Sequence, residues 1–355
     1  MQLIRDWFSR HLNDPQVVGL GALLLVGFGV IVLFGNMLAP VLASIVLAYL
    51  LEGLVRRLQR LGAPRWVAVL LVFALFICGM LLVVFSLIPM LTAQLAQLVE
   101  GLPRIIAQGQ EALRGLARNY PAMLSEQEVQ SLLAVVREEL ALLGQQLLSL
   151  FSFRSLVALL TLVVYLVLMP LLVFFFLKDK DRILQWFAGF LPRDRALAAR
   201  VWREVNVQMG NYVRGKFLEI LIVWLVTLLT FTWLELQFAM LLAVVVGLSV
   251  IIPYIGATVV TLPVAAVAYA QFGASPEFLW VLAAYGIIQA LDGNVLVPLL
   301  FSGVVNLHPV AIIVAILVFG GIWGFWGIFF AIPLATLIQA VIEAWPREPV
   351  REEAT

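Results

Sequence analysis

The sequence from Asp292 to Pro298 reads DGNVLVP and places one carboxylate inside a long apolar region, residues 282–342. A charged group at the centre of a bilayer costs roughly 2.5–3.5 kcal/mol on translocon-insertion scales, so such residues usually face a protein interior or a wet cavity. Asp292 is therefore a candidate for substrate or ion coupling, with Asn294 beside it. The alternative is that both side chains satisfy backbone groups freed at a helix break near Pro298. The two interpretations can hold together.

The composition of the chain is that of a membrane protein rather than of a water-soluble one. Of its 355 residues, 63% are hydrophobic and 12% are charged, whereas soluble proteins carry about 25% charged residues. The sequence therefore predicts an all-α polytopic membrane protein, with amphipathic helical inserts between the spans. The net charge of +1 indicates no nucleic-acid partner.

The pattern of apolar runs, breaks and charges divides the chain into six regions. We expect membrane spans 1–3 in 1–90, broken at Gly35-Asn36, an extracytoplasmic helical insert in 91–154, and span 4 in 155–177. A cytoplasmic basic helical segment in 178–216, a motif-rich transport region in 217–344 and a cytoplasmic tail in 345–355 complete the order. Because cytoplasmic loops collect Lys and Arg, both termini are predicted to be cytoplasmic, in a bacterial inner membrane.

Two of these regions are predicted to be amphipathic. In the insert, leucines recur at helical spacing from Leu91 to Leu102, and a capping box at Ser125 opens a second helix. The apolar stripes of these two predicted helices are buried either against each other in a subdomain or between subunits. Pro192 divides the basic segment into two helical pieces, whose interleaved aromatic residues fit a helix on the lipid surface. Glu219, near the start of the fifth span (217–234), is expected to reach the interface.

The second half of the chain repeats one unit, a span followed by a broken apolar segment. The breaks are Pro253-Tyr254-Ile255-Gly256 in the first copy and the glycines Gly320, Gly321 and Gly324 in the second. Interrupted segments at matching positions of two halves point to a transporter's binding site. We expect re-entrant hairpins in 238–272 and 309–344, with halves of roughly 20 Å in the first; kinked helices are the alternative.

The sequence offers little for enzyme chemistry. It contains no HExxH, GxSxG or P-loop motif, and its two histidines are far apart, so neither a metal site nor a cofactor is expected. Asp292 has no second deep acid for a dyad. We therefore predict that the chain is not an enzyme.

These motifs together resemble one known family. The sequence PYIG at 253–256, DGN at 292–294 leading to Pro298, LHP at 307–309, and the glycine cluster continuing to Pro333 are similar to the AI-2E (autoinducer-2 exporter) transporter family. The resemblance implies roughly eight hydrophobic segments, a homo-oligomer (a pentamer), and export of small solutes. Within the family, some members are thought to export the furanone signal autoinducer-2 and others to exchange Na⁺ for H⁺. It also adds His308 to the candidate substrate or ion site.

The leading interpretation is a secondary transporter that exports a small polar organic solute, such as an autoinducer-2-like signal. A monovalent cation/proton antiporter with Asp292 as the titrating group is one alternative. A channel or membrane scaffold without alternating access is the other. The expected partners are the small-molecule or ion substrate, membrane lipid and further copies of the chain.

Overall fold

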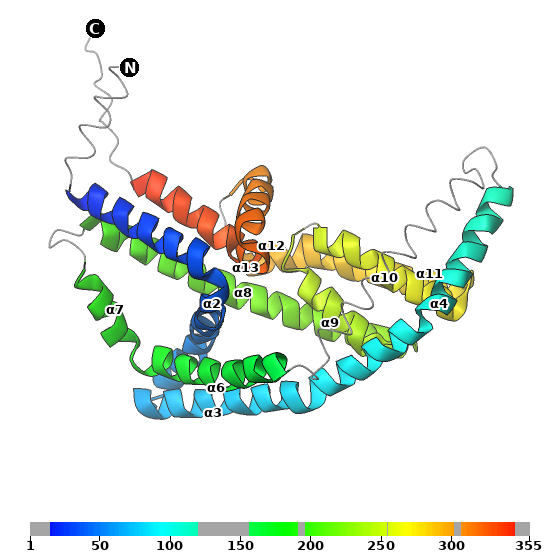
Figure 1. Cartoon of the computed structure of the whole chain (residues 1–355), viewed down its shortest axis with the longest axis horizontal. Coiled ribbons are helices and arrows are strands. Elements are labelled where there is room, and N and C mark those ends of the chain that lie inside the picture. Colours follow the sequence, from blue (N-terminus) through cyan, green and yellow to red (C-terminus); the bar gives the residue numbers. More distant parts are fainter. Residues whose placement is uncertain (1–14, 120–155, 191–195, 254, 302–306, 345–355) are drawn as a thin grey trace, which may run out of the picture. The chain divides into compact units, whose positions relative to one another are not determined.

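The structure is a computed structural model that describes residues 15–119, 156–190, 196–253, 255–301 and 307–344 (Figure 1). All regular elements in these ranges are helices. The chain forms two compact units, which are described separately below. The first unit comprises residues 1–73, 165–216 and 301–355, and the second comprises 74–164 and 217–300. The expected all-α polytopic architecture is confirmed, because six described segments are long and apolar enough to cross a membrane.

The N-terminal apolar region is one helix, α2 (Pro15–Arg60), which runs through Gly35-Asn36. The predicted break at Gly35-Asn36 is therefore wrong. Neither residue removes a backbone donor, and a glycine inside a helix costs only about 1 kcal/mol, which the surrounding apolar residues outweigh. Pro40 lies inside the helix, and Figure 1 shows a bend along α2. Such bends are common at proline, which lacks the N–H and whose ring clashes with the preceding turn.

The predicted third span continues directly into the insert. Helix α3 (Arg65–Leu82) is followed by a π-turn, η1 (Val83–Leu87), and then by α4 (Ile88–Asn119). The first predicted helix of the insert is thus confirmed, and Leu95 on it is buried. The second predicted helix, opening at Ser125, lies outside the described residues.

The middle of the chain contains three helices, α6 (Leu156–Lys178), α7 (Lys180–Ala188) and α8 (Ala196–Trp233). Helix α6 is the predicted fourth span and runs through Pro170 without interruption. Helix α8 joins the second basic piece to the fifth span, which were expected as separate elements. The sequence changes from polar to apolar near Phe217, but the helix continues through this point without a break.

The second unit has one continuous apolar core. The helices of this unit after α8 are α9 (Ala239–Ser249), α10 (Ile255–Phe272) and α11 (Pro276–Leu291). Helix α11 continues into the π-turn η2 (Asp292–Leu296) and then into α12 (Val297–Phe301). Phe231, Leu242, Val264 and Val281 are among the buried residues of the core. Helix α4 packs against α9 and α10, and the Gln94 side chain accepts a 2.9 Å hydrogen bond from the Leu241 N–H. That bond satisfies one of the free donors at the start of α9.

The last helix, α13 (Pro309–Ala344), belongs to the first unit and contains one non-helical residue, Gly324. Figure 1 shows it as two arms that meet at a sharp bend. Near the bend Trp323 stacks on Phe330. Where α13 meets α8, the Tyr212 hydroxyl donates to the Phe329 carbonyl at 3.4 Å.

Candidate functional site

Asp292 is the first residue of a π-turn in an otherwise continuous helix. The N–H of Val297 donates to the carbonyl of Asp292, five residues earlier, and Pro298 follows. A proline ring clashes with the carbonyl four residues before it and provides no N–H, so the wider turn relieves the clash. The same arrangement occurs at η1, where the Ile88 N–H donates to Val83 and Pro89 follows. π-turns inside helices are frequent at functional sites.

Asn294 supports the backbone-capping interpretation. Its side-chain amide donates a 2.8 Å hydrogen bond to the Ala290 carbonyl, one turn earlier on the same helix. The side chain of Asn294 is exposed, whereas that of Asp292 is partly buried. Asn294 therefore stabilises the π-turn that presents Asp292.

The first broken segment is a helical hairpin, because α9 and α10 pack against each other across the break. A Cβ atom placed on Gly256 would overlap the carbonyl oxygen of Ser249, at the end of α9. Only glycine permits this approach. Pro253 lies in the turn, and Tyr254 is outside the described residues. The two arms have unequal lengths, about 16 Å for α9 and about 27 Å for α10. The expectation of two equal halves of roughly 20 Å is therefore wrong.

The second broken segment turns by the same device. Gly324 has φ +59° and ψ −135°, a backbone conformation that is open to glycine and strained for other residues. After the turn, a Cβ atom on Gly327 would overlap the carbonyl oxygen of Phe319. A Cβ atom on Gly320 would lie 2.8 Å from Cγ1 of Ile328, whereas Gly321 faces open space. Both segments therefore turn sharply at these glycines. Re-entrance of either segment into the membrane stays a prediction.

His308 has a structural role at the start of α13. Its Nδ1 accepts a 3.3 Å hydrogen bond from the Val310 N–H, and Pro309 occupies the first helical position. This is a helix N-cap followed by a favoured proline. The imidazole is exposed, so capping accounts for its position.

The candidate residues fall into both units. The second unit contains Pro253, Gly256, Asp292 and Asn294, and the first contains His308, Gly320, Gly321 and Gly324. Their assembly into a single substrate site remains a prediction. Within the described residues, no group of three His, Cys, Asp or Glu side chains could hold a metal ion.

Glu219 is a buried acid, although the sequence analysis expected it to reach the membrane–water interface. It lies on α8 with 2% of its surface exposed, so the expectation that it reaches the interface is wrong. Lys216, one turn earlier on the same helix, is also buried. Two charges of opposite sign at this spacing share a helix face, and the pattern Lys-x-x-Glu inside an apolar run was the available signal. A buried intramembrane carboxylate is a coupling candidate by default.

Lys216 also contacts the end of α12. Its ammonium lies 5.3 Å from the centroid of the Phe301 ring, close enough for a cation–π interaction. Gly215 leaves room for the same ring, since a Cβ atom there would lie 2.9 Å from Phe301 Cε1. Tyr212 adds a second ring at 5.9 Å. These contacts fix the end of the helix that carries Asp292 against α8.

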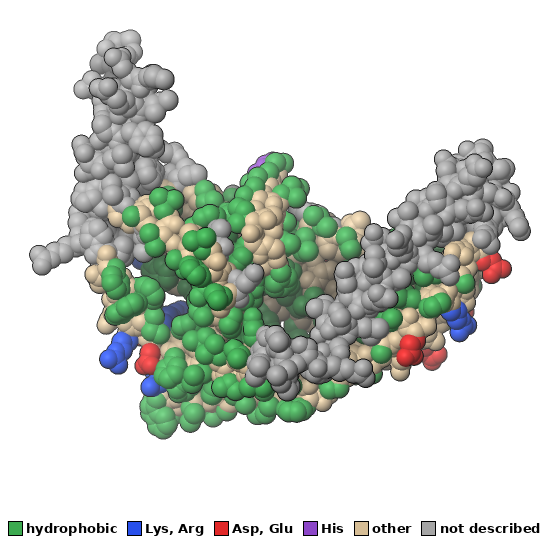
Figure 2. All heavy atoms as spheres, in the orientation of Figure 1, with side chains coloured by type: hydrophobic (Ala, Val, Ile, Leu, Met, Phe, Trp, Pro, Cys, Tyr) green, Lys and Arg blue, Asp and Glu red, His purple; other side chains and the backbone are tan. Residues whose placement is uncertain are grey.

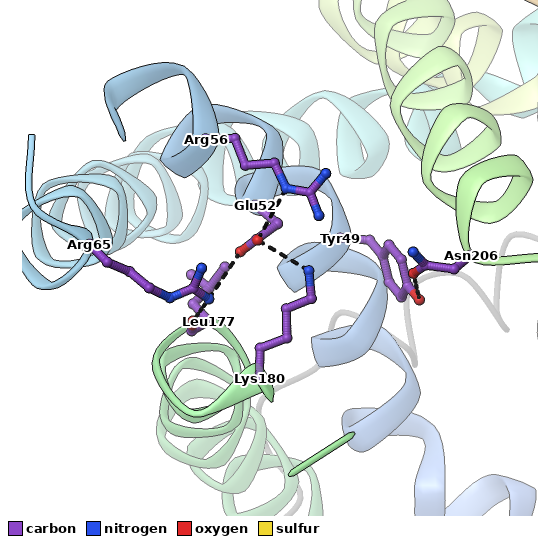
Figure 3. A network of polar contacts seen from close by, with 7 residues as sticks. All are labelled: Tyr49, Glu52, Arg56, Arg65, Leu177, Lys180 and Asn206. Atoms are coloured by element: carbon purple, nitrogen blue, oxygen red, sulfur yellow. Dashed lines mark hydrogen bonds and ion pairs between the residues drawn. The ribbon is translucent and has the colours of Figure 1, made fainter. Parts of the chain in front are cut away.

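A second buried acid, Glu52, is surrounded by three cations (Figure 3). Its Oε1 accepts hydrogen bonds from Arg56 Nε at 3.3 Å and Lys180 Nζ at 3.1 Å. Its Oε2 lies 3.7 Å from Arg65 Nη2, which also donates to the Leu177 carbonyl at 2.9 Å. The network joins α2, α3, α6 and α7 at one point. The sequence analysis missed it, although Glu52 and Arg56 have the spacing of a helical ion pair.

One turn before Glu52, a polar contact connects α2 to α8. The Tyr49 hydroxyl donates a 2.8 Å hydrogen bond to Oδ1 of Asn206 (Figure 3). On the same face of α2, a Cβ atom on Gly53 would lie 3.3 Å from Cδ of Arg214. The two helices are thus in close contact along this face.

These features define a multi-pass α-helical membrane protein with two glycine-closed hairpins. The family described as AI-2E family transporter matches residues 21–347. The chain belongs to this family of membrane transporters. The resemblance noted from the motifs of the second half is thereby confirmed.

Individual relatives span the same length. The chain is 47% identical over 353 residues to the protein named "Putative permease PerM" of Escherichia coli (strain K12), covering 99% of this chain and 100% of that protein. It is 27% identical over 318 residues to "Putative transport protein YueF" of Bacillus subtilis (strain 168), covering 87% and 84%. It is 24% identical over 332 residues to "AI-2 transport protein TqsA" of E. coli K12, covering 92% of each chain.

Proposed function

We propose that this transporter exports a small polar organic solute of the autoinducer-2 type. The observation that carries the proposal is the pair of glycine-closed hairpins at matching positions of a repeated unit. Interrupted helices of this kind form substrate sites in secondary transporters because their ends present unpaired backbone groups. The relative TqsA, which is named an AI-2 transport protein, supports the solute class.

The polar groups for such a solute come from the first break and from Asp292, which both belong to the second unit. In the turn of the first hairpin, the N–H groups of Ile251 and Ile252 bond back to Leu248 and Ser249. The carbonyls of Ile252 and Pro253 accept in turn from the N–H groups of Gly256 and Ile255. A carbonyl oxygen has a second lone pair, which can accept a hydrogen bond from a hydroxyl group of a solute. Asp292, held in its π-turn by Asn294, supplies a charged acceptor. A hydroxylated furanone offers donors that match these acceptors.

Exchange of a monovalent cation for a proton is the second candidate. Burial of Glu219 favours it, because the membrane segments then hold a buried carboxylate in addition to Asp292. A carboxylate can bind either a proton or a monovalent cation, so the two compete for such a group. Proton coupling of solute export would use the same groups.

We further propose that the chain works as a homo-oligomer in a bacterial inner membrane, with both termini in the cytoplasm. The basic residues after α6 support this orientation. Many large apolar side chains on the described helices face outward, and lipid and further copies of the chain are the surfaces that would cover them.

The test is transport by the purified full-length chain in proteoliposomes. Vesicles loaded with labelled autoinducer-2 should release it faster than protein-free vesicles, and an imposed pH gradient should change the rate if protons are coupled. A parallel assay with an internal pH dye and added Na⁺ or K⁺ tests antiport. Release at the protein-free rate together with cation-dependent proton movement would replace export by antiport.

A further inference from the structure

A groove lies where α6 meets α7, and none of the candidate transport residues lines it. Its volume is about 500 Å³, and it is lined by Phe175, Asp179, Arg182, Ile183, Trp186 and Phe187. The walls are therefore aromatic and aliphatic, with one acid and one base. All six residues belong to the first unit.

The groove begins where an apolar span ends. Helix α6 is apolar along its length and finishes at Lys178. Asp179 then joins it to α7 without losing the backbone ladder. The N–H of Asp179 donates to Phe175 at 2.8 Å, and that of Ile183 donates to Asp179 at 2.9 Å. Tryptophan and basic residues concentrate at the ends of membrane spans, at the level of the lipid headgroups.

The aromatic residues at the end of α7 and in the turn that follows it form an exposed cluster. Trp186 is 62% exposed, Phe187 57% and Phe190 69%. The Trp186 ring meets the other two edge-on, with centroids 4.9 Å apart in both cases. A helix in water would bury such rings, so their exposure indicates contact with lipid.

The charges around the groove leave one cation uncompensated. Asp179 lies 3.9 Å from Lys178, and Lys180 is bound to Glu52. Arg182 lines the groove and makes no ion pair with any residue in the described part of the chain. Figure 2 shows charged side chains gathered near the end of α6, beside exposed hydrophobic ones.

We propose that this groove binds one anionic phospholipid, with an acyl chain along its apolar wall and the headgroup phosphate on Arg182. An apolar groove whose guanidinium, that of Arg182, makes no ion pair among the described residues fits an amphiphile that carries a negative charge. Guanidinium groups bind phosphate through two parallel hydrogen bonds. The proposal concerns the membrane partner and stands independently of the transported solute.

Brominated lipids test the proposal, because bromine quenches tryptophan at contact. The full-length chain is placed in bilayers with rising fractions of brominated phosphatidylglycerol or brominated phosphatidylcholine. The signal of Trp186 is isolated by subtracting the Trp186→Phe variant. We expect half-maximal quenching at about a tenfold lower fraction of phosphatidylglycerol, the size of one charge-assisted hydrogen bond.

Two variants identify the source of any preference. Arg182→Gln should bring the two quenching curves together. Arg203→Gln, which removes an exposed cation from α8, should leave them separate. Equal quenching by both lipids in the unmodified chain would overturn the proposal in favour of bulk membrane contact. Absence of quenching at Trp186 would also overturn it, because another protein surface would then cover the groove.

Discussion

Replacing the hairpin glycines by alanine should destabilise the protein, whereas the same change at open glycines should not. A Cβ atom at Gly256 or Gly327 meets a backbone carbonyl oxygen, which cannot rotate away. Overpacking of this kind costs about 1–3 kcal/mol, against a gain of about 1 kcal/mol in helix propensity from Gly to Ala. Gly286 and Gly321 have no atom within 4 Å of the added carbon, so only the gain applies there.

The assay is the apparent melting temperature of each purified variant, followed by size-exclusion chromatography in detergent, with flux measured in proteoliposomes. Gly256→Ala and Gly327→Ala should melt below the unmodified chain and transport more slowly. Their matched controls, Gly286→Ala and Gly321→Ala, should melt at the same temperature or higher. Equal behaviour of all four variants would refute the close approach of the hairpin arms.

Three further changes address the acids and the topology. Asp292→Asn should insert and assemble normally but lose most transport, because Asn caps about as well as Asp yet carries no charge; normal flux at normal expression would leave only the capping role. Glu52→Gln should lower the apparent melting temperature, since it removes the buried negative charge that three partly exposed cations contact, a loss of about 1–3 kcal/mol, and unchanged melting would contradict its part in joining four helices. In a Cys78→Ser background, Ser275→Cys should react with an impermeant maleimide on intact cells if the first hairpin is re-entrant. Labelling only after the inner face is opened would show a full crossing.

The helices and both hairpins could be predicted because their signals are local. Apolar runs define the spans, and Pro253 followed by Gly256 marks the first break, because proline removes a backbone donor and glycine permits the turn. The glycine at position 324 likewise marks the second turn. Each feature depends on residues close together in the sequence.

Other features depended on neighbours that the sequence does not specify. Gly35-Asn36 looks like a turn, but only proline removes a donor, and α2 continues through the pair. Glu219 is buried by packing around α8, so its distance from the end of an apolar run was misleading. The two π-turns could have been predicted from the sequence, because each is followed directly by a proline in the next helix, Pro89 after η1 and Pro298 after η2. The Glu52 network could not be predicted, because its partner Lys180 lies on a helix that is distant in the sequence.

The measurement that tests the central claim most directly is counterflow in proteoliposomes. Vesicles containing the full-length chain are loaded with unlabelled autoinducer-2, and entry of a trace of labelled solute is followed from outside. A secondary transporter predicts entry that saturates with external concentration and is accelerated by the internal solute. Entry that rises linearly with concentration and ignores the internal solute would contradict the account and indicate a channel.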